Sequence, residues 1–117
     1  MAFEHLLALS ESIAFHEDIG RKALAARIEE LNSACREGLA AMKHVTLHTP
    51  RRSELAGPIA CFEVAGLSAE DVTSRLAAKK IRTNASPYAA SYARIAAGVM
   101  NTPEEVDRAL AAVRSLA

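Results

Sequence analysis

The sequence is poor in aromatic residues and in cysteine. Its 117 residues include no tryptophan and only 4% aromatic residues, so a core has to be built from aliphatic side chains. Its two cysteines, Cys35 and Cys61, lie far apart and show no Cys-x-x-Cys spacing, which argues against a disulfide scaffold or a cysteine metal site. We therefore predict that both are small buried hydrophobic residues in a reducing compartment.

The sequence also lacks an excess of charge and a long hydrophobic run. Fourteen Lys and Arg residues balance fourteen Asp and Glu residues, without a basic block, which argues against nucleic acid or a membrane surface as the partner. No apolar stretch is as long as a membrane-spanning helix, and the first residues lack the basic region of a signal peptide. These absences predict a cytoplasmic protein.

The hydrophobic pattern predicts a single α+β domain over residues 1–117. Apolar residues at helical spacing alternate with stretches of period two, and turn residues separate them. The expected helices cover about 3–19, 22–42, 69–80 and 103–113, and the expected strands cover 45–48, 59–64, 81–84 and 92–97. The order α-α-β-β-α-β-β-α predicts a small mixed or antiparallel sheet of about four strands packed by helices.

Two helix starts carry clear capping signals. The Ser68 hydroxyl precedes an acidic first turn and is placed to accept from free backbone amides. Thr102 is followed by Pro103 at the first helical position and by Glu105 at the third, the pattern of a capping box.

No complete catalytic constellation is present. The sequence has neither a glycine-rich phosphate loop nor a His-Glu-x-x-His motif, so it predicts no catalytic residue of its own and no metal ligand. His44 and His48 are four residues apart in a predicted strand, where that spacing shares a face but separates the side chains. We interpret them as solvated edge histidines, with metal binding as the alternative. The pair Arg51 and Arg52 fits solvated surface better than an anion grip.

Arg94 is the one residue whose pattern suggests binding. Alternation along the predicted strand places Tyr92, Arg94 and Ala96 on one face and the apolar residues between them on the other. A guanidinium among small residues faces a gap, and its fork of donors matches a carboxylate. An ordinary surface arginine remains the alternative interpretation.

The stretch from Tyr92 to Asp107 resembles the C-terminal part of class V aminotransferases, the fold type I pyridoxal-phosphate enzymes that include cysteine desulfurases and isopenicillin-N-epimerase-like proteins. An Arg-Ile strand at Arg94 is followed by Asn-Thr-Pro-Glu-Glu-Val-Asp, similar to the family's helix start. Three further segments are similar to the family's small domain: 15–21, 27–31 and 66–72. Ala96 stands where the family commonly has serine, and Gly98 and Met100 stand where histidine and tyrosine often occur.

The resemblance implies that Arg94 binds the α-carboxylate of an amino-acid substrate, while Asn101 and Thr102 serve as turn and cap. It implies pyridoxal phosphate in the complete enzyme, held by a large domain in the same or a separate chain. No lysine here has the family's Ser/Thr-x-His-Lys setting, so we expect the isolated chain to bind no cofactor and to be inactive alone. A bare apolar surface at the N-terminal helix should mark where the large domain docks, and a homodimer is possible.

A second hypothesis treats the chain as a free-standing α+β interaction or small-ligand-binding module without catalysis. In that case Arg94 would be an ordinary surface residue.

Overall fold

The computed structural model describes residues 3–117 and confirms the predicted α+β class and element order. The elements are α1 (Phe3–Ile19), α2 (Arg21–Ala40), β1 (Val45–Leu47), the short 3₁₀ helix η1 (Ser53–Leu55), β2 (Ala60–Val64), α3 (Ala69–Ala78), β3 (Asn84–Ala85), β4 (Ala93–Ile95) and α4 (Pro103–Arg114). Only η1 was not expected from the sequence.

The strands form a four-stranded sheet in the order β1-β2-β4-β3, and every pair is antiparallel. In β2, Ala60, Phe62 and Val64 are buried, while the residues between them are more exposed. Strand β4 alternates in the same way, so one face of the sheet is apolar and faces the core.

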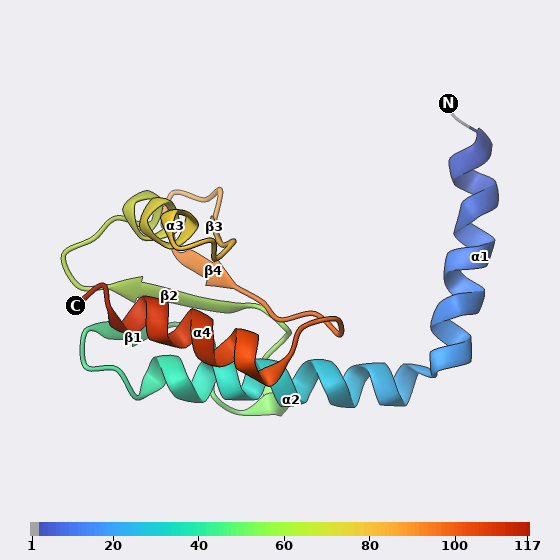
Figure 1. Ribbon diagram of the computed structural model, residues 1–117, viewed down its shortest axis with the longest axis horizontal. Coiled ribbons are helices and arrows are strands. Elements are labelled where there is room, and N and C mark those ends of the chain that lie inside the picture. The colour runs from blue at the N-terminus through green and yellow to red at the C-terminus, as the bar shows by residue number, and fades with distance from the viewer. Residues whose placement is uncertain (1–2) are drawn as a thin grey trace.

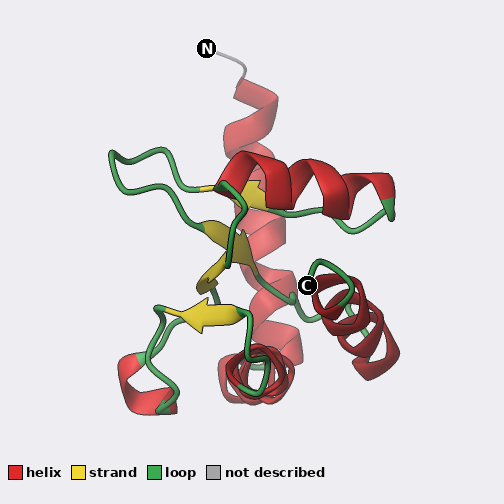
Figure 2. Ribbon diagram, turned by 90° about the vertical axis from the view of Figure 1, so that its left-hand side faces the viewer, coloured by secondary structure: helices red, strands yellow, loops and turns green. Residues whose placement is uncertain are grey.

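The core lies between this apolar face and three helices. Figure 2 shows α3 and α4 on one side of the sheet, whereas loops and η1 occupy the other side. Helices α2, α3 and α4 each contribute a buried apolar stripe to one continuous cluster, and Leu39, Phe62, Leu76 and Val113 are completely buried in it. We name the side that α2, α3 and α4 leave uncovered the open face of the sheet.

All four strands are shorter in the structure than predicted, and the last two differ most. Ile81 was expected to begin the third strand, but its N–H donates to the carbonyl of Leu76 and so closes the end of α3. Strand β3 therefore covers only Asn84–Ala85. The fourth strand ends at Ile95 because the backbone of Ala97 bonds to the side chain of Asn32 instead of to another strand.

Helix α1 extends away from the rest of the protein (Figure 1). Gly20, with φ of 91°, turns the chain between α1 and α2. The radius of gyration is 16.1 Å, whereas a compact chain of this length would have about 13 Å. Among residues 3–117, no helix is long and apolar enough to cross a membrane. The protein is thus a packed body, residues 21–117, with a projecting arm.

Candidate functional site

Arg94 lies at the centre of the open face. The register of the sheet places it opposite Cys61 of β2 and opposite Asn84 of β3. Its neighbours along the strand, Ala93 and Ile95, point into the core and are buried. The alternation predicted from the sequence is therefore confirmed, and the guanidinium belongs to the face that α2, α3 and α4 leave uncovered.

Most of the hydrogen-bonding capacity of Arg94 is unused inside the protein. One Nη2–H donates to the carbonyl oxygen of Ala85 at 3.4 Å, a long hydrogen bond. Its Nε is buried without a partner. None of the ion pairs among residues 3–117 involves Arg94. A half-buried guanidinium with free donors is suited to bind an anion from outside the chain.

An aromatic pair borders Arg94 on the open face. The rings of His48 and Tyr92 lie with their centroids 4.1 Å apart and their planes tilted by 31°. His48 also places its Nε2 2.7 Å from a carboxylate oxygen of Glu63. The sequence predicted that Tyr92 lies on this face but did not indicate His48 as its partner. His48 reaches Tyr92 because its backbone N–H donates to the carbonyl of Cys61, which extends the β1–β2 pairing by one residue.

The loop between β3 and β4 is held closed beside Arg94. Buried Ser86 accepts from the backbone N–H of Tyr92 at 2.8 Å and donates to the carbonyl of Ala90 at 3.3 Å. The Ser91 hydroxyl donates to the carbonyl of Ser86 at 2.9 Å. These bonds fix the base of the loop, whose tip carries the exposed Tyr88.

The turn after β4 performs the structural role predicted for it. Asn101 accepts from the N–H of Gly98 at 2.8 Å, and its amide donates to Glu105 at 2.9 Å. Thr102 and Glu105 form the reciprocal capping box of α4. The hydrogen bond from Asn101, followed by that from the Thr102 backbone, lowers the pKa of Glu105. Both Asn101 and Thr102 are thus committed to the helix start.

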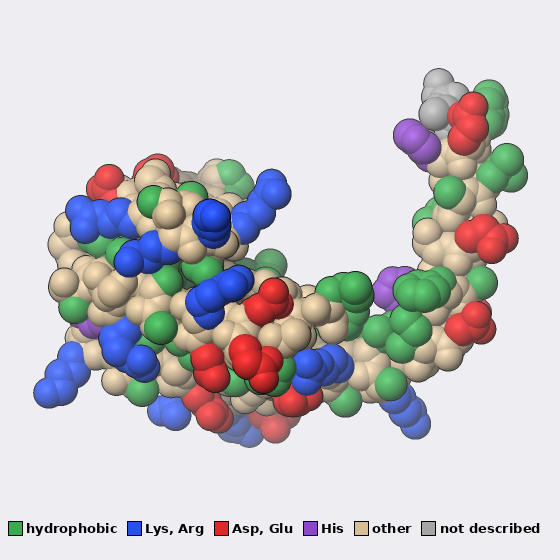
Figure 3. Space-filling view, in the orientation of Figure 1, with side chains coloured by type: hydrophobic (Ala, Val, Ile, Leu, Met, Phe, Trp, Pro, Cys, Tyr) green, Lys and Arg blue, Asp and Glu red, His purple; other side chains and the backbone are tan. Residues whose placement is uncertain are grey.

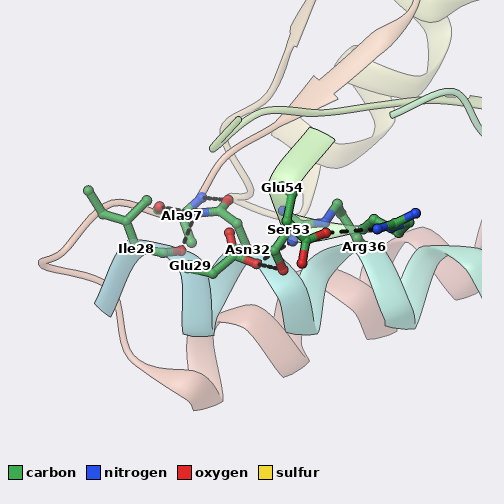
Figure 4. A network of polar contacts seen from close by, with 8 residues as sticks. Ile28, Glu29, Asn32, Arg36, Ser53, Glu54 and Ala97 are labelled. Carbon is green, nitrogen blue, oxygen red and sulfur yellow. Dashed lines mark hydrogen bonds and ion pairs between the residues drawn. The ribbon is translucent and has the colours of Figure 1, made fainter. Parts of the chain in front are cut away.

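Buried polar contacts hold the end of strand β4, which carries Arg94, against α2 (Figure 4). The Asn32 amide donates to the carbonyl oxygens of Ile28 and Ala97. Arg36, only 1% exposed, pairs with Glu29, and Glu29 also accepts from the hydroxyl of Ser53 in η1. The bond from Ser53 is the largest cause that lowers the pKa of Glu29, with Arg36 adding to it and burial opposing it.

The remaining sequence candidates do not join the open-face cluster. His44 lies with its Nε2 3.3 Å from the carbonyl of Val113, away from His48, and residues 3–117 contain no group of three metal-ligating side chains. Arg51 and Arg52 are exposed, and Arg52 makes a 3.5 Å surface ion pair with Glu54. Cys35 is buried as predicted. Cys61 was also expected to be buried, but it is half-buried because it lies on the open face.

Comparisons with known proteins give the fold a context. The family model described as aminotransferase class-V matches residues 2–109. The apo structure of a cysteine desulfurase from Thermococcus onnurineus NA1 is similar, with a TM-score of 0.81 and 24% identity over 89% of this chain. The cysteine desulfurase CsdA from Escherichia coli, in an S-sulfonic acid form, is also similar, with a TM-score of 0.71 and 20% identity over 90% of this chain.

The similarity covers only part of each solved structure. The chain spans 28% of the length of the Thermococcus protein and 27% of the length of the Escherichia protein. No curated protein matches the chain significantly.

Proposed function

The chain belongs to the class V aminotransferase family, and from this membership we propose that it forms the substrate-closing small domain of a pyridoxal-phosphate-dependent enzyme acting on an amino acid. The observation that carries the proposal is the guanidinium of Arg94, which lies on the open face with no acidic partner among the described residues. In this role Arg94 binds the α-carboxylate of the substrate and thereby orients its α-carbon.

The chain's own residues do not fit the family's cofactor. A Schiff-base lysine has to be enclosed near a carboxylate and phosphate-binding donors. All four lysines, Lys22, Lys43, Lys79 and Lys80, are exposed. We therefore assign the cofactor to a large domain, in the same or a separate chain, and derive no chemical step from this chain alone.

The exposed apolar residues of helix α1 support the proposal that a large domain docks on this chain. Phe3, Leu7 and Phe15 are 71%, 73% and 65% exposed, and Leu9 and Ile13 are at least half exposed. At 3.6 residues per turn, Leu7, Leu9 and Phe15 point in three different directions around the helix axis. Polar residues lie between these apolar ones, but so many large apolar side chains exposed on several sides of one helix normally mark a surface that other protein covers. We propose that the large domain encloses α1, with a homodimer contact as the alternative cover.

The first test looks for the missing domain. The coding sequence next to this chain, in frame or as a neighbouring gene, should encode a domain with a Schiff-base lysine, and that domain should co-purify with this chain. Deletion of residues 1–20 should abolish co-purification while leaving the body folded. A wild-type chain that stays monomeric, carries no accessible apolar surface by dye binding and captures no such domain would contradict the proposal.

The second test concerns Arg94 in the reconstituted enzyme. Because hydrogen bonds to charged groups contribute about 1.5–3 kcal/mol, Arg94→Gln should lower kcat/KM for the amino acid by about 10- to 100-fold. Arg94→Lys should recover only part of this loss, since lysine lacks the planar fork. Arg114→Gln, which removes an exposed arginine in the last turn of α4, is the matched control. Equal kcat/KM values for Arg94→Gln and wild type would refute the assignment.

The isolated chain gives a third measurement. Titration with pyridoxal phosphate, followed by absorbance, should show no tight lysine adduct. A saturable adduct at low micromolar concentration would mean that the chain holds the cofactor itself.

A further inference from the structure

A second concave site lies apart from Arg94. It is a cavity of about 370 Å³ between α2, α4, the end of α3 and strand β4. Its volume falls in the range of pockets that hold small organic molecules, about 300–1,000 Å³. Arg94 is not among its lining residues. The role proposed for Arg94 therefore does not account for this cavity.

The floor of the cavity is apolar and built from core residues. Cys35 of α2, Ile95 of β4, and Val106 and Ala109 of α4 line it, and all four are buried. Burial raises the pKa of the Cys35 thiol, so that this group stays neutral and contributes no charge to the floor. Such a floor accepts a hydrocarbon chain and disfavours a charged group.

The mouth of the cavity is basic. Lys80, Arg82 and Arg108 line it from the segment after α3 and from α4, and all three are exposed. None of the ion pairs among residues 3–117 involves any of them. Figure 3 shows Lys and Arg side chains over α3 and between α3 and α4, while Asp and Glu side chains lie over the right-hand part of α4.

A single carboxylate lines the same cavity. Glu105 accepts hydrogen bonds from the side chain of Asn101 and from the backbone N–H of Thr102, both at its Oε2, so one of its two carboxylate oxygens is engaged in the cap of α4. Arg108 also lies near enough for its charge to contribute to lowering the pKa of Glu105. Three cations against one engaged acid leave the mouth with a net positive charge.

Lys80 has a backbone conformation that normally selects glycine. Its φ is +61°, and it is the only non-glycine residue with positive φ among residues 3–117. The Lys80 N–H donates to Ala77 and the Ile81 N–H donates to Leu76, which together form the Schellman motif that ends α3. Glycine is usual at this position because other L-residues are strained there by about 1–2 kcal/mol. A lysine therefore lies at the mouth of the cavity in a backbone conformation that glycine would adopt without strain.

We propose that this cavity binds a small organic carboxylate with an apolar chain. The carboxylate lies at the mouth between Lys80, Arg82 and Arg108, and the chain covers the apolar floor. All the lining residues belong to this chain, and Arg94 is not one of them. The inference therefore goes beyond the substrate-carboxylate role of Arg94 and stands independently of it.

The test uses the 117-residue chain and octanoate, with 1-octanol as an uncharged probe of similar length. Isothermal titration below the micellar concentration should show saturable binding of octanoate and about tenfold weaker binding of octanol. Backbone amide shifts should change around residues 80–82, 95–97 and 105–109.

Two variants separate binding from folding. Lys80→Gly removes the cation and relieves the positive φ, so it should raise Tm and still weaken octanoate binding by about threefold to tenfold. Arg108→Gln should weaken binding by a similar factor. Arg114→Gln should leave octanoate binding unchanged, because Arg114 does not line the cavity.

Several results would overturn the proposal. Equal affinity for octanoate and octanol, or octanoate binding that survives both Lys80→Gly and Arg108→Gln, would exclude a basic carboxylate site. Loss of binding in Arg94→Gln alone would place the carboxylate at the open face, which supports the role of Arg94 and refutes this inference.

Discussion

Asn32 and Ala97 are joined by two hydrogen bonds that replace a strand partner. The Asn32 amide donates to the carbonyl of Ala97 at 2.7 Å, and its side-chain oxygen accepts from the N–H of Ala97 at 2.9 Å. The two residues are 65 positions apart, and the Asn32 side chain is completely buried. This contact fixes the end of β4 to α2 and so fixes the strand that carries Arg94.

Asn32→Ala should therefore destabilise the fold. It leaves both backbone groups of Ala97 without a partner in a buried place, and each such group costs about 1–3 kcal/mol. We expect the free energy of unfolding in urea to fall by about 2–4 kcal/mol. Asn84→Ala, at an exposed position of β3, is the control and should change the free energy by less than about 0.5 kcal/mol. Equal effects of the two substitutions would show that the Asn32 contact contributes little.

Gly38 allows α2 and α4 to approach closely. A Cβ at this position would overlap the side chain of Leu110 on α4. Gly38→Ala gains about 1 kcal/mol of helix propensity but overpacks the core, which costs about 1–3 kcal/mol. We expect a net loss in thermal unfolding, and the double variant Gly38→Ala with Leu110→Ala should lose less than the sum of the two single variants. Strict additivity would contradict the close contact.

Arg36 is a buried charge with incomplete compensation. Its Nε and Nη1 have no hydrogen-bond partner, and only Nη2 pairs with Glu29. Glu29→Gln removes the neutralising charge and should cost about 1–3 kcal/mol. Arg36→Met keeps the volume, removes the buried charge and should cost less than Glu29→Gln in urea unfolding. The opposite order would show that the guanidinium stabilises the fold by itself.

Glu29 should also make stability depend on acid pH. Its folded-state pKa is lowered, chiefly by the hydrogen bond from Ser53. A lowered carboxyl pKa contributes stability that is present above the unfolded-state pKa and is lost as the pH falls through the folded-state value. Between about pH 5 and pH 3, the wild type should lose more free energy of unfolding than Ser53→Ala does. Parallel pH profiles for the two proteins would show that the bond has no such effect.

Local signals in the sequence predicted much of the fold. The caps at Ser68 and Thr102 were predicted correctly because each depends on residues within three positions. The face of Arg94 followed from strand alternation alone. Nothing local indicated that Asn32 would bond to Ala97, or that His48 would stack on Tyr92, because both contacts join segments that only the folded chain brings together.

The family resemblance and the structure contribute different parts of the candidate site. The resemblance supplied a role for Arg94, while the structure supplied its open face and its unused donors. The basic cavity had no sequence signal, since Lys80 and Arg108 belong to different elements. The positive φ of Lys80 was likewise hidden, because lysine gives no local indication of a left-handed residue.

The exposed apolar residues of α1 should limit the solubility of this chain. When two chains meet, their α1 helices can bury apolar surface against each other, so self-association should rise steeply with protein concentration. Cutting the chain at the Gly20 joint would remove that tendency and leave the packed body in solution. A domain that covers α1 would therefore also prevent self-association of this chain, as a chaperone does. This effect would be separate from any role of that domain in catalysis.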